Sequence, residues 1–149
     1  MINTTLCYIE KDNKYLMLLR NKKENDLNEG KWIGIGGKFL PGETAEQCLL
    51  REAYEETDLK LTEFRFHGII KFNSDKWESE DMYLYSASGF EGEVDFNCPE
   101  GELRWIDKDK IMDLNLWEGD RLFLKDLLEG KDEINMTLTY EGDKLINIS

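Results

Sequence analysis

The sequence predicts an α/β (α+β) domain in which a central mixed β-sheet is clamped between helices. Apolar runs of strand length recur along the chain with polar or glycine-containing turns between them, whereas two other segments place their apolar residues at helical spacing. The chain has 149 residues and 40% hydrophobic content, enough to bury one core. We therefore expect residues 1–149 to form a single domain.

The first expected strands form a hairpin. Thr4–Glu10 and Tyr15–Arg20 are apolar runs on either side of the polar residues 11–14. Residues 21–30 are polar and predict a loop, and Trp32–Gly36 predicts a short strand that leads into a glycine pair.

A helix is expected to begin after Thr44, which is a good N-cap, with Gln47 three positions later completing a capping box. At about 100° per residue, the apolar and charged residues of this segment separate onto two sides. The apolar side holds Leu49, Leu50, Ala53 and Tyr54, and the charged side holds Arg51, Glu52, Glu55 and Glu56.

The second half of the chain supplies the remaining strands and a second helix. These are the strands Phe64–Phe72 and Met82–Phe90 around a polar loop at 73–80, a short strand at Leu103–Ile106, a helix at Gly119–Leu128 and a terminal hairpin about residues 141–143.

The charged side of the first helix predicts a metal site. Glu52 faces Glu55 at i+3 and Glu56 at i+4, and like charges at this spacing repel by up to about 4 kcal/mol per pair at a separation of about 4 Å. A cation would remove this repulsion, and a set of carboxylate oxygens favours Mg²⁺ or Mn²⁺ over Zn²⁺. Arg51, four residues before Glu55, can hold one carboxylate through a forked pair of hydrogen bonds.

The alternative for this helix is a solvated acidic face. A solvated face has no need of the glycine pair at 36–37 or of the Pro41-Gly42 turn, which brings Glu43 to the helix entrance. These preceding residues favour the metal site.

Composition limits the partners. A net charge of −13 and a pI near 4.5 argue against binding to nucleic acid polymers. A small polyphosphate remains possible if divalent ions neutralise the carboxylates and lysines face the phosphates. Lys23 and Lys38 are placed near the expected site by sequence, although both could equally be solvated surface lysines.

Other sequence features favour the cytoplasm. The three cysteines are odd in number and far apart, which indicates free thiols in a reducing compartment, and no apolar run reaches the length of a membrane span. The only histidine, His67, lies in a strand-like segment and is expected to be structural or on the surface. We expect no membrane partner and either a monomer or a homodimer.

The stretch from Gly37 to Leu59 resembles a Nudix box, the signature of hydrolases that act on nucleoside diphosphates linked to another group. The matching residues are Gly37, Glu43, the run Arg51-Glu52-Ala53-Tyr54-Glu55-Glu56 and the closing Thr57-Asp58-Leu59. The resemblance implies an αβα sandwich. Asp58 stands where the family usually has Gly in a left-handed conformation, which Asp tolerates better than most residues.

The resemblance also assigns roles within the box. It implies that Glu52 and Glu56, with the Gly36 carbonyl, bind one metal and that Glu55 is a candidate for a second. Glu100 lies where related enzymes often have a further carboxylate that binds metal or deprotonates water; its alternative is a surface turn.

Three further residues of the box are implied to support the glutamates. Arg51 belongs with the catalytic set but, like Glu43, is expected to orient the carboxylates rather than to react. Gly37 has a structural role.

Segments that extend beyond the box on both sides resemble the MutT-type branch, which removes oxidised purine nucleotides such as 8-oxo-dGTP. They are Gly30-Lys31-Trp32, the run 34–38 and Leu116-Trp117-Glu118-Gly119-Asp120. An indole can stack on a purine and a carboxyl can bind its edge, so Trp117 and Asp120 are candidates for base recognition; Trp117 could instead pack in the core.

The expected reaction is attack of water on a phosphorus atom of the polyphosphate, which releases a nucleoside monophosphate and pyrophosphate while a glutamate accepts the proton. The expected cofactor is Mg²⁺, with Mn²⁺ also possible. The alternatives are hydrolysis of another nucleoside diphosphate derivative and a non-catalytic Nudix-like nucleotide sensor. The intact glutamates favour an enzyme.

Overall fold

The computed structural model describes residues 2–22 and 28–149 of the chain. Their strands form one mixed sheet in the order β3-β2-β1-β6-β5-β8-β9, with β4 paired to β1 and β7 paired to β2. The strands are β1 (Ile2–Lys11), β2 (Lys14–Leu19), β3 (Trp32–Ile33), β4 (Ile35–Lys38), β5 (Lys60–Ser74), β6 (Glu80–Glu91), β7 (Glu102–Asp107), β8 (Met136–Glu141) and β9 (Lys144–Ile148).

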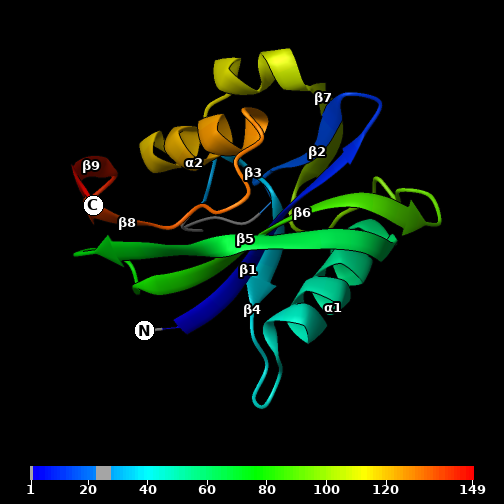
Figure 1. Ribbon diagram of the computed structural model, residues 1–149, viewed down its shortest axis with the longest axis horizontal. Coiled ribbons are helices and arrows are strands. Elements are labelled where there is room, and N and C mark those ends of the chain that lie inside the picture. Colours follow the sequence, from blue (N-terminus) through cyan, green and yellow to red (C-terminus); the bar gives the residue numbers. More distant parts are fainter. Residues whose placement is uncertain (1, 23–27) are drawn as a thin grey trace.

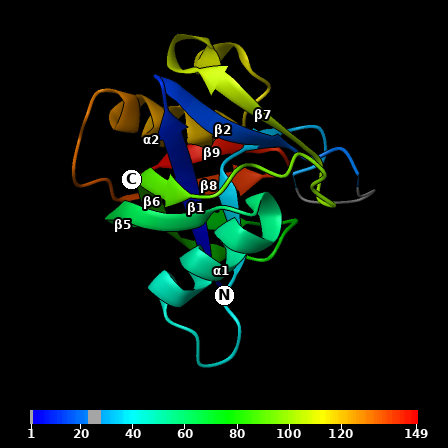
Figure 2. The same cartoon turned by 90° about the vertical axis from the view of Figure 1, so that its right-hand side faces the viewer.

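Helices cover both faces of this sheet, as Figures 1 and 2 show from two directions. Helix α1 (Ala45–Thr57) lies on one side and α2 (Glu118–Leu128) on the other, next to a short 3-10 helix, η1 (Lys108–Asp113). This arrangement confirms the predicted αβα sandwich with a mixed central sheet.

Side chains of β1 alternate between two hydrophobic cores, one on each face of the sheet. Leu6 and Tyr8 belong to the cluster that includes the apolar residues of α2, whereas Cys7 and Ile9 belong to the cluster that includes Leu49 of α1. Successive side chains of a strand point to opposite faces, so a strand with helices on both sides is apolar throughout. This is why β1 is a continuous apolar run in the sequence.

The start and end of α1 follow the sequence prediction. Thr44 accepts a hydrogen bond from the Gln47 backbone N–H at 3.1 Å, and Gln47 accepts from the Thr44 N–H at 2.9 Å, which completes the capping box. At the other end, Asp58 has φ 66° and ψ 13°, the left-handed conformation expected at that position.

Three elements differ most from the prediction, whereas the bounds of several others shift by one or two residues. Strand β5 begins at Lys60 rather than Phe64, because register shifts against β6 interrupt the alternation that marks a strand. The expected strand at 32–36 is divided into β3 and β4 at Gly34, where a side chain would approach the Cys7 carbonyl to 2.7 Å. The 3-10 helix η1 was not predicted, since it shows no helical spacing of apolar residues.

Candidate active site

A cavity of about 480 Å³ lies against the sheet and is lined by residues of both halves of the chain. Acidic residues of the box line one part of it, together with Glu100 and Arg20. Aromatic and carboxyl side chains from the second half of the chain line another part. Strands β1, β4 and β6 connect these parts, because β1 pairs with both of the other two.

The glycine pair allows β4 to pack closely against its neighbours. A Cβ atom at Gly36 would lie 1.8 Å from the Thr5 carbonyl oxygen, and one at Gly37 would lie 2.6–2.8 Å from the Glu52 carboxyl. Only glycine therefore fits at these two positions without movement of β1 or of Glu52. The predicted structural role of Gly37 has a physical basis in this contact with Glu52.

Arg51 links the turn before α1 to the helix. Its Nε and Nη2 donate to the two oxygens of Glu43 at 2.7 and 2.9 Å, while its Nη1 donates to Glu52 at 2.8 Å and to Glu55 at 3.1 Å. Nη2 also reaches the Lys38 carbonyl at 3.0 Å. The forked pair is thus made with Glu43, eight residues earlier, and only a single bond reaches Glu55.

These bonds fix the ionisation of Glu43. The Arg51 guanidinium, with help from the Leu40 N–H, lowers the pKa of Glu43 to about 2. Glu43 is therefore a negative charge that anchors Arg51, and its role in supporting the metal ligands stays a prediction.

Glu56 is the most buried carboxyl of the helix, with 7% of its surface exposed. One of its oxygens accepts a hydrogen bond from the Gly36 N–H at 3.0 Å. Burial, and next the charge of Glu52, raise the pKa of Glu56 to about 8, although the Gly36 N–H and Arg20 act in the opposite direction. A buried carboxylate beside a second one needs a positive partner to stay ionised.

Glu100 faces the same cavity and forms an ion pair with Arg20, whose Nη2 lies 3.0 Å from it. The backbone N–H of Arg20 donates to Lys31 and its carbonyl accepts from Gly30, which fixes the end of β2 beside the site. Sequence reasoning missed Arg20, because the signal was only a charged residue at the end of an apolar strand.

The side chains of Glu52, Glu56 and Glu100 offer the oxygen donors that Mg²⁺ or Mn²⁺ prefers. The negative charges of Glu52 and Glu100 repel that of Glu56, and a bound cation would offset this repulsion. The donor chemistry therefore fits such an ion. Across residues 2–22 and 28–149, however, no three acidic, histidine or cysteine side chains are gathered closely enough to hold an ion as they stand. Arg51 binds an oxygen of Glu52 and the Gly36 N–H binds an oxygen of Glu56, so these two carboxylates would have to rotate to bind an ion.

Two predicted ligands are placed differently from the others. The Glu55 side chain is 57% exposed, is bound to Arg51 and does not line the cavity. At Gly36 it is the N–H group that contacts the acidic cluster, through Glu56. A metal role for Glu55 or for the Gly36 carbonyl stays a prediction.

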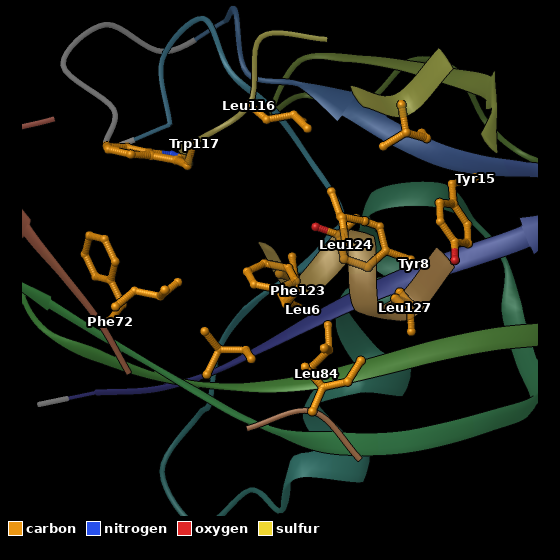
Figure 3. Packing of buried hydrophobic residues seen from close by; sticks show 14 of the residues in the cluster. Leu6, Tyr8, Tyr15, Phe72, Leu84, Leu116, Trp117, Phe123, Leu124 and Leu127 are labelled. Carbon is orange, nitrogen blue, oxygen red and sulfur yellow. The ribbon is translucent and has the colours of Figure 1, made fainter. Parts of the chain in front are cut away.

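Trp117 lies at the beginning of α2 and is 5% exposed. Its ring packs edge-on to Phe72 and Tyr140, with centroid distances of 6.2 and 5.2 Å, and its Nε1 donates to Asn28 at 2.8 Å. Figure 3 shows Trp117 and Phe72 at one end of the apolar cluster. Trp117 is therefore a core residue that also lines the cavity, and its contact with a base stays a prediction.

Asp120 also lines the cavity and is 8% exposed. Burial raises its pKa to about 7, opposed by Lys31 and reinforced by Glu80. The Asp120 carboxyl forms no hydrogen bond or ion pair with the described part of the chain, so it is free to bind a ligand.

The two lysines predicted to contact the substrate differ in what the structure shows of them. Lys38 lines the cavity, whereas Lys23 lies outside the described residues.

His67 lies in a second cavity lined by other residues. Its Nδ1 must donate to the Asp132 carbonyl at 2.9 Å, since a carbonyl only accepts, and in the neutral ring its Nε2 accepts from the Ser86 hydroxyl at 2.7 Å. These bonds tie β5 and β6 to the segment before β8, as expected for a structural histidine.

The stability of the metal-free protein is expected to fall as pH rises. Asp120 has a pKa of about 7 in the folded state and about 3.9 when unfolded, so between these values the folded state binds more protons. Glu56 and Glu80, raised to about 8 and about 7, act in the same direction. Asp120→Asn should therefore reduce the loss of unfolding free energy between about pH 5 and about pH 7.5 in denaturant titrations. A pH dependence unchanged by this substitution would contradict the buried, protonated Asp120.

Comparison with known proteins relates this site to a family. Residues 2–127 match the NUDIX domain. The oxidised purine nucleoside triphosphate hydrolase of Danio rerio is 35% identical over 115 residues, which cover 76% of this chain and 73% of that protein. The nucleoside triphosphatase NudI of Enterobacter is 28% identical over 130 residues, covering 80% of this chain and 92% of that protein.

The fold of this chain matches that of a solved structure over its whole length. The crystal structure of the MutT protein from Bacillus halodurans has a TM-score of 0.88 and 26% identity, and the match covers 100% of this chain and 97% of that one. No helix in the described part of the chain combines the length and apolar character of a membrane span. The family match and the curated relative together show that this chain belongs to the NUDIX domain family and is a Nudix hydrolase.

Proposed function

We propose that the protein is a Mg²⁺-dependent nucleoside triphosphate pyrophosphohydrolase that acts on oxidised purine nucleotides, with 8-oxo-dGTP converted to 8-oxo-dGMP and pyrophosphate. The observation that supports this most is the composition of one cavity. Glu52, Glu56 and Glu100 line it together with Trp117 and Asp120, so carboxylates suited to a metal and groups suited to a base share one space.

The residues of the acidic part would have separate tasks. Glu52 and Glu56 would hold the divalent ion, which when bound offsets phosphate charge and acidifies water. Arg51 keeps Glu52 oriented, and Arg20 and Lys38 bring positive charge to a cavity that is otherwise acidic.

Glu100 is our candidate for the group that accepts the proton of the attacking water. It lines the cavity and is held by Arg20 rather than by the Arg51 network of α1. A carboxylate that is separate from the main ligands can take up a proton without loss of the metal. Attack on a phosphorus atom of the polyphosphate then releases the nucleoside monophosphate.

The base would lie in the aromatic part of the cavity. Phe72 and Trp117 supply ring surfaces there, and Asp120 supplies a buried carboxyl with no partner in the described chain. A buried polar group that only the correct base satisfies gives strong discrimination. The name of the Danio rerio relative, an oxidised purine nucleoside triphosphate hydrolase, supports an oxidised purine as the base.

A panel of nucleotides with Mg²⁺, scored for pyrophosphate and for monophosphate, tests this proposal. We expect 8-oxo-dGTP to give the highest kcat/KM, with activity lost in EDTA and restored by Mg²⁺ or Mn²⁺. The panel should include dGTP, the pyrimidine triphosphates and ADP-ribose. Hydrolysis confined to a nucleoside diphosphate derivative would replace the proposed substrate, and binding without hydrolysis of any member would favour a nucleotide sensor.

A further inference from the structure

Glu80 is a carboxyl in the cavity that the proposed reaction does not use. It begins β6, where it pairs with Ile2 of β1 and with Phe72 of β5. Two residues further, Met82 pairs with Thr4, and Thr4 in turn pairs with Lys38 of β4. Side chains two residues apart share a face of the sheet, so Glu80 and Thr4 lie on the face that lines the cavity.

Glu80 lies on β6, between β1, which pairs with β4 beside the acidic residues, and β5, which carries Phe72 of the aromatic part. Lys38, which continues from the glycine pair beside Glu52, lowers the pKa of Glu80, although burial dominates and raises it to about 7. The charge of Glu80 in turn raises the pKa of Asp120. Glu80 is therefore close enough to interact electrostatically both with Lys38, beside the acidic helix, and with Asp120, the proposed base-binding residue.

Polar groups near Glu80 have no partner within the described chain. The Thr4 side chain is 6% exposed, and its buried hydroxyl oxygen makes no hydrogen bond. The indole N–H of Trp77, another residue of the cavity wall, is also buried and unpaired. The Glu80 carboxyl likewise forms no hydrogen bond or ion pair with the described residues. Native proteins rarely leave buried groups such as the Thr4 hydroxyl and the Trp77 N–H unsatisfied, because each costs about 1–3 kcal/mol.

In a nucleotide, the sugar connects the phosphates to the base. A group placed between a phosphate site and a base site therefore meets the pentose, whose polar atoms are mainly hydroxyls. A carboxylate accepts a hydrogen bond from a hydroxyl, and a threonine hydroxyl can both donate and accept. A hydrogen bond to a charged acceptor is among the stronger ones.

From these positions we infer that Glu80, assisted by Thr4, is a specificity residue that binds the 3′-hydroxyl of the nucleotide sugar. The inference rests on the proposed function for the location of the phosphates and the base. It adds a sugar contact to that function, and it predicts that nucleotides lacking the 3′-hydroxyl bind poorly.

Binding affinity tests this contact without requiring turnover. Calorimetric titration with Ca²⁺ in place of Mg²⁺ would compare dGTP with its 2′,3′-dideoxy counterpart. For the wild-type protein we expect the dideoxy nucleotide to bind about tenfold more weakly, the loss typical of one hydrogen bond to a charged group. For Glu80→Leu we expect the two nucleotides to bind equally.

Two further variants separate this contact from general damage. Glu80→Gln keeps an oxygen acceptor without the charge and should retain a smaller preference for the 3′-hydroxyl. Glu91→Leu, at the exposed opposite end of β6, should retain all of it. Thermal unfolding of each variant checks that the sheet is intact.

Equal binding of the two nucleotides to the wild-type protein would overturn the role of Glu80, as would a preference that survives in Glu80→Leu. Both outcomes leave the proposed function standing, because dGTP still binds. If neither nucleotide binds and 8-oxo-dGTP also fails to bind in the same titration, the proposed function and the sugar contact are overturned together.

Discussion

Glu56→Gln is expected to lower kcat by about 100-fold or more while the protein stays folded. Glutamine keeps an oxygen that can accept from the Gly36 N–H, at 3.0 Å in the wild-type structure, so β4 and α1 remain connected. It cannot carry the negative charge that binds a divalent ion. The measurement is the steady-state rate of pyrophosphate release with saturating Mg²⁺, together with thermal unfolding to confirm the fold.

Glu46→Gln is the matched control for this variant. Glu46 lies in the first turn of the same helix, is exposed and does not line the cavity. Its replacement removes the same charge from α1 and should leave kcat within about twofold. If Glu56→Gln behaved like Glu46→Gln, Glu56 would not be a metal ligand.

Trp117→Ala is expected to reduce the free energy of unfolding by about 3–5 kcal/mol, because it removes a large side chain that is 5% exposed between Phe72 and Tyr140. The same change should raise KM for purine substrates more than it lowers kcat, since contact with a base stabilises the bound substrate and the transition state alike. Chemical denaturation and steady-state kinetics measure the two effects.

Trp117→Phe separates these two roles. Phenylalanine keeps an aromatic ring between its neighbours but loses the hydrogen bond from Nε1 to Asn28, so the loss of stability should be well below that of the alanine variant. KM should stay close to the wild-type value if the ring surface binds the base. A Trp117→Ala protein that unfolds like the wild type would contradict the core packing, and one with unchanged KM would remove Trp117 from the base site.

The local features of the fold could be read from the sequence. The capping box at Thr44 and the left-handed Asp58 depend on neighbouring residues alone, and both occur as expected. Most of the strands and the two covering helices also follow from the periodicity of apolar residues. The register shifts in β5 hid its first residues, because they interrupt that periodicity.

The contacts of the site required the folded chain. Spacing within α1 suggested that Arg51 would fork onto a carboxylate of its own helix, but the turn before the helix brings Glu43 to the guanidinium instead. Arg20, Asn28, Thr4 and Glu80 carried no motif, and strand pairing and loop packing place them in the cavity. Long-range pairing of this kind cannot be read from local pattern.

Crystals grown with Mn²⁺ and a non-hydrolysable nucleoside triphosphate would show whether the glutamates of α1 hold divalent ions against a polyphosphate, because Mn²⁺ is located by its anomalous scattering. We expect a Mn²⁺ peak within about 2.3 Å of Glu52 and Glu56 oxygens and of a phosphate oxygen. Anomalous density that is absent from α1, with Glu52 still bound to Arg51 and the nucleotide elsewhere, would overturn the proposed metal site.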